Sequence, residues 1–386
     1  MLTLIENGEI YAPARLGRQD VLMLNNRIAK VGEIDRRALA SLKLELDVID
    51  ASDCFVTPGF IDPHQHLLGG SGEKGFSTQT PEIYASELAL AGITTVVGCL
   101  GVDTTTKTMP ALLAKAKGLN EEGLTAYLWS GGYSVPPTTI MSSVREDLLF
   151  ISEVIGAGEV AISDERSTAP DPLELSKLVK DAYVGGLLSK KCGVTHFHVG
   201  EERARLKPLR TLIDDFEINP ALLYPTHVER NEELMREAIE LAGRGSYVDI
   251  DTVEQDLARW LRFYLNNGGN PARLTVSSDA SINSPRSLFE QICSCILEHD
   301  FPFEQTLAFV TTNTAAVLKL ANKGRLEVGC DADALVLRKG SLELKDVIAQ
   351  GRCLVRGGQL AFGENFLSKS NRRLRLEGKF VGKESL

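Results

Sequence analysis

The stretch that decides the fold runs from Pro58 to His66 and reads Pro-Gly-Phe-Ile-Asp-Pro-His-Gln-His. Its first half belongs to a short apolar segment, residues 57–61, that is typical of a buried strand. Because residues two positions apart in a strand point to the same side, His64 and His66 can bind one ion through neutral imidazole nitrogens. A glycine-rich segment, Leu68-Gly-Gly-Ser-Gly-Glu73, follows directly. This context predicts a metal site where a first strand ends.

Strand-like and helical segments alternate through the middle of the chain. Eight strands are expected, at residues 57–61, 94–100, 125–130, 159–163, 194–199, 222–226, 247–250 and 274–277. Helices with apolar residues at helical spacing are expected between them, including residues 82–91, 109–122, 144–155, 173–189 and 231–242. The pattern predicts an α/β fold with a parallel sheet closed into a barrel, in which chemistry lies at the carboxyl ends of the strands.

The two chain ends have a different pattern, with short strands separated by turns such as Asn25-Asn26 and Gly357-Gly358. We expect residues 1–56 and 326–386 to pair into one composite β domain, beside a barrel of residues 57–325.

Composition narrows the class of protein. The formal net charge of −10 over 386 residues argues against a nucleic-acid partner or an anionic membrane surface. The N-terminal segment carries Glu6 and Glu9 and no cationic leader, and there is no run of 18 apolar residues. Seven scattered cysteines indicate reduced thiols and a cytoplasmic protein, and Cys293 and Cys295 fall in an apolar helical pattern typical of packing.

The histidines concentrate at the expected strand ends. Five of the six lie in or just past such an end, namely His64, His66, His196, His198 and His227. Of the pair on the fifth strand, His198 is followed by Gly200-Glu201 and is the better ligand candidate, and one of the two is open to a role in the core. His299 is expected at the surface. Asp279 ends the eighth strand, where an aspartate beside a metal can be both ligand and proton carrier.

Several motifs together resemble the isoaspartyl dipeptidases of the amidohydrolase superfamily, over essentially the whole chain. They are the segment 58–82, Gly131-Gly-Tyr-Ser-Val-Pro136, Ala161-Ile-Ser-Asp-Glu-Arg166, Phe197-His-Val-Gly200, Pro225-Thr-His-Val-Glu-Arg230 and Ser277-Ser-Asp279. The resemblance implies a distorted (β/α)8 TIM barrel with a small β-sandwich made from both chain ends. It also implies zinc, one or two ions per chain, and a homo-oligomer.

The resemblance further implies a role for each site residue. His64 and His66 would hold the more buried ion, His198 and His227 the more exposed one, and Asp279 would bind the buried ion and move the proton. The substrate would be bound by a second set, in which Glu73 grips an α-ammonium, the two arginines bind carboxylates, Tyr133 binds the scissile carbonyl oxygen, and two polar side chains complete the pocket: Glu73, Arg166, Arg230, Tyr133, Ser71 and Asn283. These residue types suit the task, since guanidinium groups match carboxylates and a phenol can donate to an oxyanion.

The sequence departs from the family at the fourth strand. The family has a carboxylated lysine that bridges two metals, whereas Glu159 stands here and no carboxylated lysine is expected. A glutamate supplies the same charge with an arm shorter by about 3–4 Å. Either Glu159 still bridges two ions, or one ion is held tightly and the other weakly. Val102 and Asn283 also differ from the family, which has threonine and serine there.

We therefore predict a zinc-dependent isoaspartyl dipeptidase, which releases aspartate and an amino acid from a small dipeptide. Two alternatives are open. A related hydrolase of the hydantoinase, dihydroorotase or N-acyl-amino-acid type would share the metal site and need no ammonium-binding Glu73. A non-catalytic scaffold relative would have lost metal ligands, and His64, His66, His198, His227 and Asp279 are all present.

Overall fold

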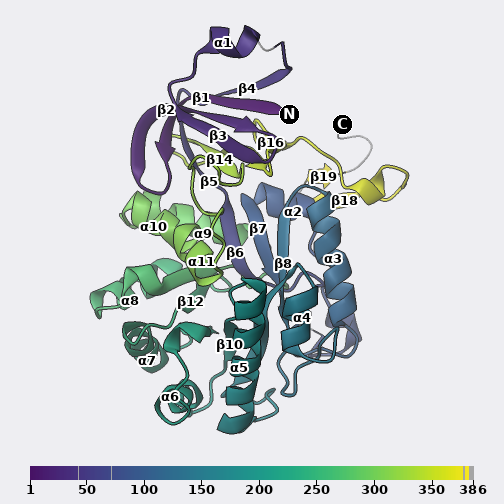
Figure 1. Cartoon of the computed structure of the whole chain (residues 1–386), viewed down its shortest axis with the longest axis vertical. Helices are drawn as coiled ribbons and strands as arrows, with labels where there is room; N and C mark the ends of the chain where they lie inside the picture. Colours follow the sequence, from purple (N-terminus) through teal and green to yellow (C-terminus); the bar gives the residue numbers. More distant parts are fainter. Residues whose placement is uncertain (42, 71, 377–378, 382–386) are drawn as a thin grey trace.

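The computed structural model describes residues 1–41, 43–70, 72–376 and 379–381. Figure 1 shows the two parts of the chain along its long axis, with a sheet made from both chain ends at one end and the barrel at the other. Strands from the two chain ends lie side by side in that sheet, where Cys54–Pro58 pairs with Ala334–Arg338 although more than 270 residues separate them.

The barrel contains eight parallel strands. They are β6 (Phe60–Gln65), β7 (Ile93–Gly98), β8 (Thr125–Ser130), β9 (Val154–Ile162), β10 (Thr195–Val199), β11 (Leu223–Thr226), β12 (Val248–Asp251) and β13 (Leu274–Ser277). Six of them form one sheet in the order β11-β10-β9-β8-β7-β6, and β12 pairs with β13. The turn after β13 meets β6 where His66 N donates to Ala280 O at 3.0 Å and Asp279 N donates to His64 O at 3.1 Å, and β11 meets β12 through a side chain, where the Tyr224 hydroxyl donates to Asp249 Oδ1 at 3.2 Å. The predicted fold class, a distorted (β/α)8 barrel with a β domain from both ends, is confirmed.

Helices surround these strands. They are α2 (Ala85–Leu90), α3 (Met109–Glu121), α4 (Val144–Phe150), α5 (Pro172–Ser189), α6 (Lys207–Asp214), α7 (Glu232–Gly243), α8 (Leu257–Asn266), α9 (Arg286–Leu297), α10 (Phe303–Phe309) and α11 (Thr312–Val317), with short 3-10 turns η1 (Phe76–Thr78), η2 (Pro220–Leu222), η3 (Pro271–Arg273) and η4 (Asn365–Leu367). Side-chain caps begin several of them. Asp171 accepts from Glu174 N at α5, and Asn231 accepts from Leu234 N at α7. No helix within the described ranges is both long and apolar enough to cross a membrane.

The sheet of the chain ends is forked and folds around its own core. Its strands are β1 (Leu2–Tyr11), β2 (Arg15–Leu24), β3 (Arg27–Gly32), β4 (Leu46–Asp50), β5 (Cys54–Pro58), β14 (Ala334–Arg338), β15 (Leu344–Ala349), β16 (Arg352–Arg356) and β17 (Gln359–Leu360); α1 (Arg36–Ser41) precedes β4, and β18 (Leu374–Leu376) pairs with β19 (Lys379–Val381) near the end of the chain. The two ends meet where β5 pairs with both β1 and β14. Ile10, Val56 and Val336 are fully buried in the core of this part.

Gly59 marks the passage from the end sheet into the barrel. A Cβ atom at this position would lie 2.2 Å from Oγ1 of Thr94, so a larger residue would clash. We predicted the first barrel strand at residues 57–61 and the domain boundary after residue 56, whereas Thr57 and Pro58 end β5 and the barrel strand begins at Phe60. The reason is that no charged residue separates the two strands, so the hydrophobic pattern does not show where the first ends. His64 therefore lies inside β6, and His66 follows it directly.

Candidate metal centre and active site

Glu159 occupies the centre of a buried cluster of histidines. The side chain comes from the second half of β9 and is fully buried. Its Oε2 lies 3.1 Å from His64 Nε2 and 3.7 Å from His66 Nε2. Its Oε1 lies 2.8 Å from His198 Nδ1 and 3.3 Å from His227 Nε2. One carboxylate thus faces two pairs of imidazoles, one pair with each oxygen.

Asp279 approaches the same cluster from the turn after β13. Its Oδ1 lies 3.1 Å from His66 Nε2 and 3.4 Å from His64 Nε2. Asp279 has a φ of 46° and His227 a φ of 61°. Residues other than glycine rarely adopt positive φ angles, and those that do concentrate at functional sites. The turns at these two strand ends therefore aim both side chains inward.

The buried polar atoms of the cluster fit a metal ion. His64 is 0% exposed, yet neither of its ring nitrogens has a hydrogen-bond partner, and Asp279 Oδ1 also lacks one. Such atoms are costly to bury unless something binds them. The donor atoms of His64, His66, Cys99 and Glu159 all lie within 4.8 Å of one another. Within the same distance limit, Glu159 forms a second group with His198 and His227. Imidazole and carboxylate are typical ligands of zinc and similar ions.

The ionisation of the cluster follows from the same geometry. Burial disfavours the charged imidazole of His64, but the carboxylates of Glu159 and Asp279 outweigh it and raise its pKa well above the usual value. Burial also opposes the charge on His227, and its hydrogen bonds to Asp251 and Glu159 nevertheless raise its pKa to about 9. The surrounding imidazoles hold the pKa of Asp279 below its usual value despite burial. Asp279 is therefore a carboxylate, able to accept a proton.

Two aspartates that we did not predict orient the histidines of the second pair. His198 Nε2 lies 3.0 Å from Asp164 Oδ2, and His227 Nδ1 lies 2.6 Å from Asp251 Oδ2. In each imidazole the other nitrogen faces Glu159. A carboxylate behind a histidine fixes the ring and its tautomer for metal binding. The sequence held a signal for Asp251, because it ends β12 as Asp279 follows β13.

The structure separates the two histidines of β10. His198 joins the cluster, whereas His196 Nδ1 donates to Tyr224 O at 3.0 Å and the ring stacks on Trp129 at 5.3 Å between ring centroids. Burial and the nearby His64 lower the pKa of His196 well below its usual value. His196 is therefore a neutral packing residue. His299 is exposed, as predicted.

Tyr133 lies beside the cluster, with its hydroxyl 2.9 Å from His198 Nδ1. Burial, reinforced by the charge of Glu159, raises the pKa of this phenol well above its usual value. The group therefore remains protonated and can donate a hydrogen bond.

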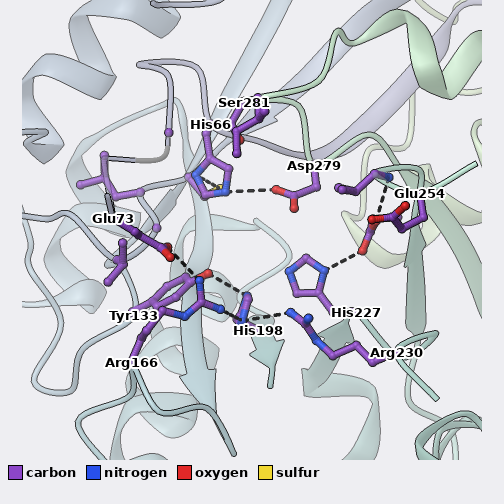
Figure 2. Close-up of a pocket in the computed structure, with 18 of the residues that line it drawn as sticks. His66, Glu73, Tyr133, Arg166, His198, His227, Arg230, Glu254, Asp279 and Ser281 are labelled. Atoms are coloured by element: carbon purple, nitrogen blue, oxygen red, sulfur yellow. Dashed lines mark hydrogen bonds and ion pairs between the residues drawn. The ribbon is translucent and has the colours of Figure 1, made fainter. Parts of the chain in front are cut away.

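A cavity of about 670 Å³ opens over the cluster, and charged side chains stand on its walls. Figure 2 shows Glu73 and Arg166 pointing toward each other on one side and Arg230 on the other, with His198 between the two guanidinium groups. Arg166 Nη1 lies 2.9 Å from Glu73 Oε1, and its Nε and Nη2 each donate to Asp164 at 2.8 Å. Arg230 Nε donates to Val199 O at 2.7 Å. The cavity size is typical of a small-molecule site.

Ser71 and Asn283, two predicted substrate-binding residues, are not among the described residues that line the cavity. Ser71 lies outside the described residues. The Asn283 amide donates to Val253 O at 2.7 Å. Among the described residues that line the cavity, this loop contributes Ser281 and Ile282 instead.

Comparisons with known proteins agree with this arrangement. The sequence model of the amidohydrolase family matches residues 261–354 of this chain. The β-aspartyl dipeptidase of the thermophilic, keratin-degrading Fervidobacterium islandicum AW-1 is similar in structure, with a TM-score of 0.89 and 36% identity over 94% of this chain and 99% of that one. The same protein in complex with the β-Asp-Leu dipeptide aligns at 35% identity, also with a TM-score of 0.89, over 94% of this chain and 98% of that one. The dihydroorotase of Lactobacillus gasseri is 24% identical over 95% of this chain and 97% of its own.

The parallel barrel and the buried histidine–carboxylate cluster at its strand ends define a metal-dependent hydrolase of the TIM-barrel type. Its sequence and structure identify the family within that class. The chain belongs to the amidohydrolase superfamily.

Proposed function

We propose that the protein hydrolyses the β-linked amide bond of isoaspartyl dipeptides and releases aspartate and an amino acid. One observation carries this proposal: Glu73, Arg166 and Arg230 stand together on the cavity beside the candidate metal cluster. An isoaspartyl dipeptide carries one ammonium and two carboxylates, so its charges match one carboxylate and two guanidinium groups. The similarity to the β-aspartyl dipeptidase of F. islandicum supports the same substrate class.

The free site already pairs two of these groups with each other. Glu73 and Arg166 form an ion pair in which their side chains are 49% and 30% exposed. An exposed pair of this kind contributes about 0–1 kcal/mol. A ligand that offers an ammonium to Glu73 and a carboxylate to Arg166 can therefore replace the pair at little expense in free energy.

The chain's own residues supply the steps around the scissile bond. A divalent ion held by the cluster would lower the pKa of a water molecule and polarise the amide carbonyl. Asp279, a carboxylate at the cluster, accepts the proton of the attacking water and returns it to the leaving amine. Tyr133, a protonated phenol, donates to the carbonyl oxygen as negative charge develops there.

Glu159 fits the bridging role that the sequence left open. Its two oxygens face the two histidine pairs separately, so its carboxylate reaches both pairs despite the shorter arm. We propose two ions per chain, most simply zinc, with Glu159 between them. Metal analysis of the purified protein tests this number, and one equivalent at full activity would contradict it.

A second candidate is a cyclic-amide hydrolase, which the dihydroorotase relatives favour. Dihydroorotate carries a carboxylate and no ammonium, so Glu73 would face it without a partner. The test compares turnover of β-aspartyl-leucine, dihydroorotate, a hydantoin and an N-acyl amino acid by the zinc-loaded protein. We expect turnover of the dipeptide to exceed that of the others by at least about 10-fold, the lower end of what one unpaired charge costs. Preferred turnover of a cyclic amide would overturn the proposal.

A further inference from the structure

Cys99 is a buried thiol inside the candidate metal cluster. It follows β7, and its backbone N donates to Gln65 O at 2.9 Å, so its position is fixed by the barrel. Its side chain is 1% exposed, and its Sγ lies 3.6 Å from His66 Nδ1 and 3.9 Å from Glu159 Oε2. All seven cysteines lie in the described part of the chain, and only Cys99 belongs to a group of potential metal ligands.

The neighbouring His64 independently points to a ligand at this place. Both of its ring nitrogens are buried without a hydrogen-bond partner, and its Nε2 is 3.1 Å from the Glu159 oxygen that also faces Cys99. The four donor atoms of this group lie within 4.8 Å of one another, a spacing that suits one shared ion. Cys99 also lines the cavity, which gives an ion a path to it.

We propose that the Cys99 thiolate is a direct ligand of the ion at the His64 and His66 position, together with Glu159. As the sulfur–metal bond forms, the thiol proton would leave to solvent and a water ligand of the incoming ion would be displaced. These four residues would supply two nitrogens, one oxygen and one sulfur, beside Asp279, whose Oδ1 lies 3.1 Å from His66 Nε2. The inference rests on the metal site and not on the dipeptide as substrate.

A sulfur donor changes which ion the site prefers. Thiolate is a soft ligand and favours zinc over harder ions such as Mn²⁺ or Mg²⁺. The second group, Glu159 with His198 and His227, is also buried and contains no sulfur. The two positions should therefore differ, with the Cys99 position selective for zinc and the second position more permissive.

X-ray absorption of the zinc-loaded protein, without substrate, tests the proposal. A Zn–S distance of about 2.3 Å is distinguishable from Zn–N distances of about 2.0–2.1 Å. We expect a sulfur contribution in the natural protein that persists in Cys295→Ser, a control at a buried cysteine of α9, and disappears in Cys99→Ser and in Cys99→Ala.

The outcomes are separable. No sulfur contribution in the natural protein overturns the proposal, whether or not the variants fold, and leaves Cys99 as a hydrogen-bond partner of His66. A sulfur contribution that survives in a folded Cys99 variant also overturns it. Failure to hydrolyse β-aspartyl dipeptides would overturn the proposed function and leave this measurement unaffected.

Discussion

The cavity has a floor, formed by Glu159 and the histidines around it, and a rim, formed by Glu73, Arg166 and Arg230. The two differ in burial and in the elements that carry them. On the floor, Glu159 and His64 are 0% exposed and every neighbour is a residue of a strand or of the turn directly after one. On the rim, Glu73 stands on a glycine-rich loop and is half exposed, with one ion pair to Arg166. Charges interact strongly in the buried cluster and are screened at the rim. From this comparison we expect substitutions on the floor to change the chemical step and substitutions at the rim to change substrate binding.

The largest effect is expected on the floor, at Asp279. Asp279→Asn keeps the size of the side chain and removes its ability to accept a proton. We expect turnover of β-aspartyl-leucine to fall by about 10²–10⁴-fold, the range for loss of a general acid–base group. Steady-state kinetics alongside zinc analysis provides the measurement. Near-normal turnover with a full metal complement would remove Asp279 from proton transfer.

The next largest effect is expected at Asp164, which contacts His198 from the side away from Glu159. Asp164→Asn removes the charge that orients His198 and binds Arg166. We expect metal affinity or activity to fall by about 10–100-fold, as for other groups that hold a metal-binding histidine. Asp214→Asn, at a surface ion pair with Arg244, is the matched control and should change neither. Equal behaviour of the two variants would show that Asp164 does not act through His198.

At the rim, Glu73→Gln is expected to act on substrate binding alone. Loss of a charged hydrogen bond of about 1.5–3 kcal/mol corresponds to a rise in KM of roughly 10–100-fold. Zinc content should stay unchanged, because Glu73 lies outside the metal groups. A loss of zinc together with activity would mean that floor and rim are not separate.

The smallest effect is expected in the number of protons that the protein releases when it binds the metal. In the metal-free protein the His227 pKa of about 9 means that this imidazole carries a proton at neutral pH, and an ion must displace it. Apparent zinc affinity should therefore rise as the pH increases toward 9. Calorimetry in two buffers of different ionisation enthalpy should detect proton release near pH 7. No release would contradict the protonated cluster.

The sequence predicted the floor better than the rim, for a physical reason. Strand ends in a parallel barrel converge whatever the loops do, so His64, His66, His198, His227 and Asp279 could be assigned to one site from their places along the chain, and the structure brings them together. The boundary between the two parts was harder to predict, because residues 54–61 contain no charged residue and Gly59 alone separates the two strands.

Pairings between distant elements were not predictable from sequence. Asp164 and Asp251 were missed because their importance depends on which nitrogen of His198 and His227 faces Glu159. The cysteine pattern predicts reduced thiols and does not single out Cys99, since its nearness to His66 arises only when β6 and β7 pair. Asn283 was assigned to the substrate from its place in the sequence, whereas its loop turns the amide to Val253 O.

The measurement that tests the central claim most directly compares β-aspartyl-leucine with its N-acetylated form on the zinc-loaded protein. The two compounds share the scissile bond and both carboxylates, and only the first offers an ammonium to Glu73. We predict that kcat/KM for the free amine is higher by about 10–100-fold, and that Glu73→Gln removes most of this preference. Equal hydrolysis of both compounds, or of neither, would contradict the account.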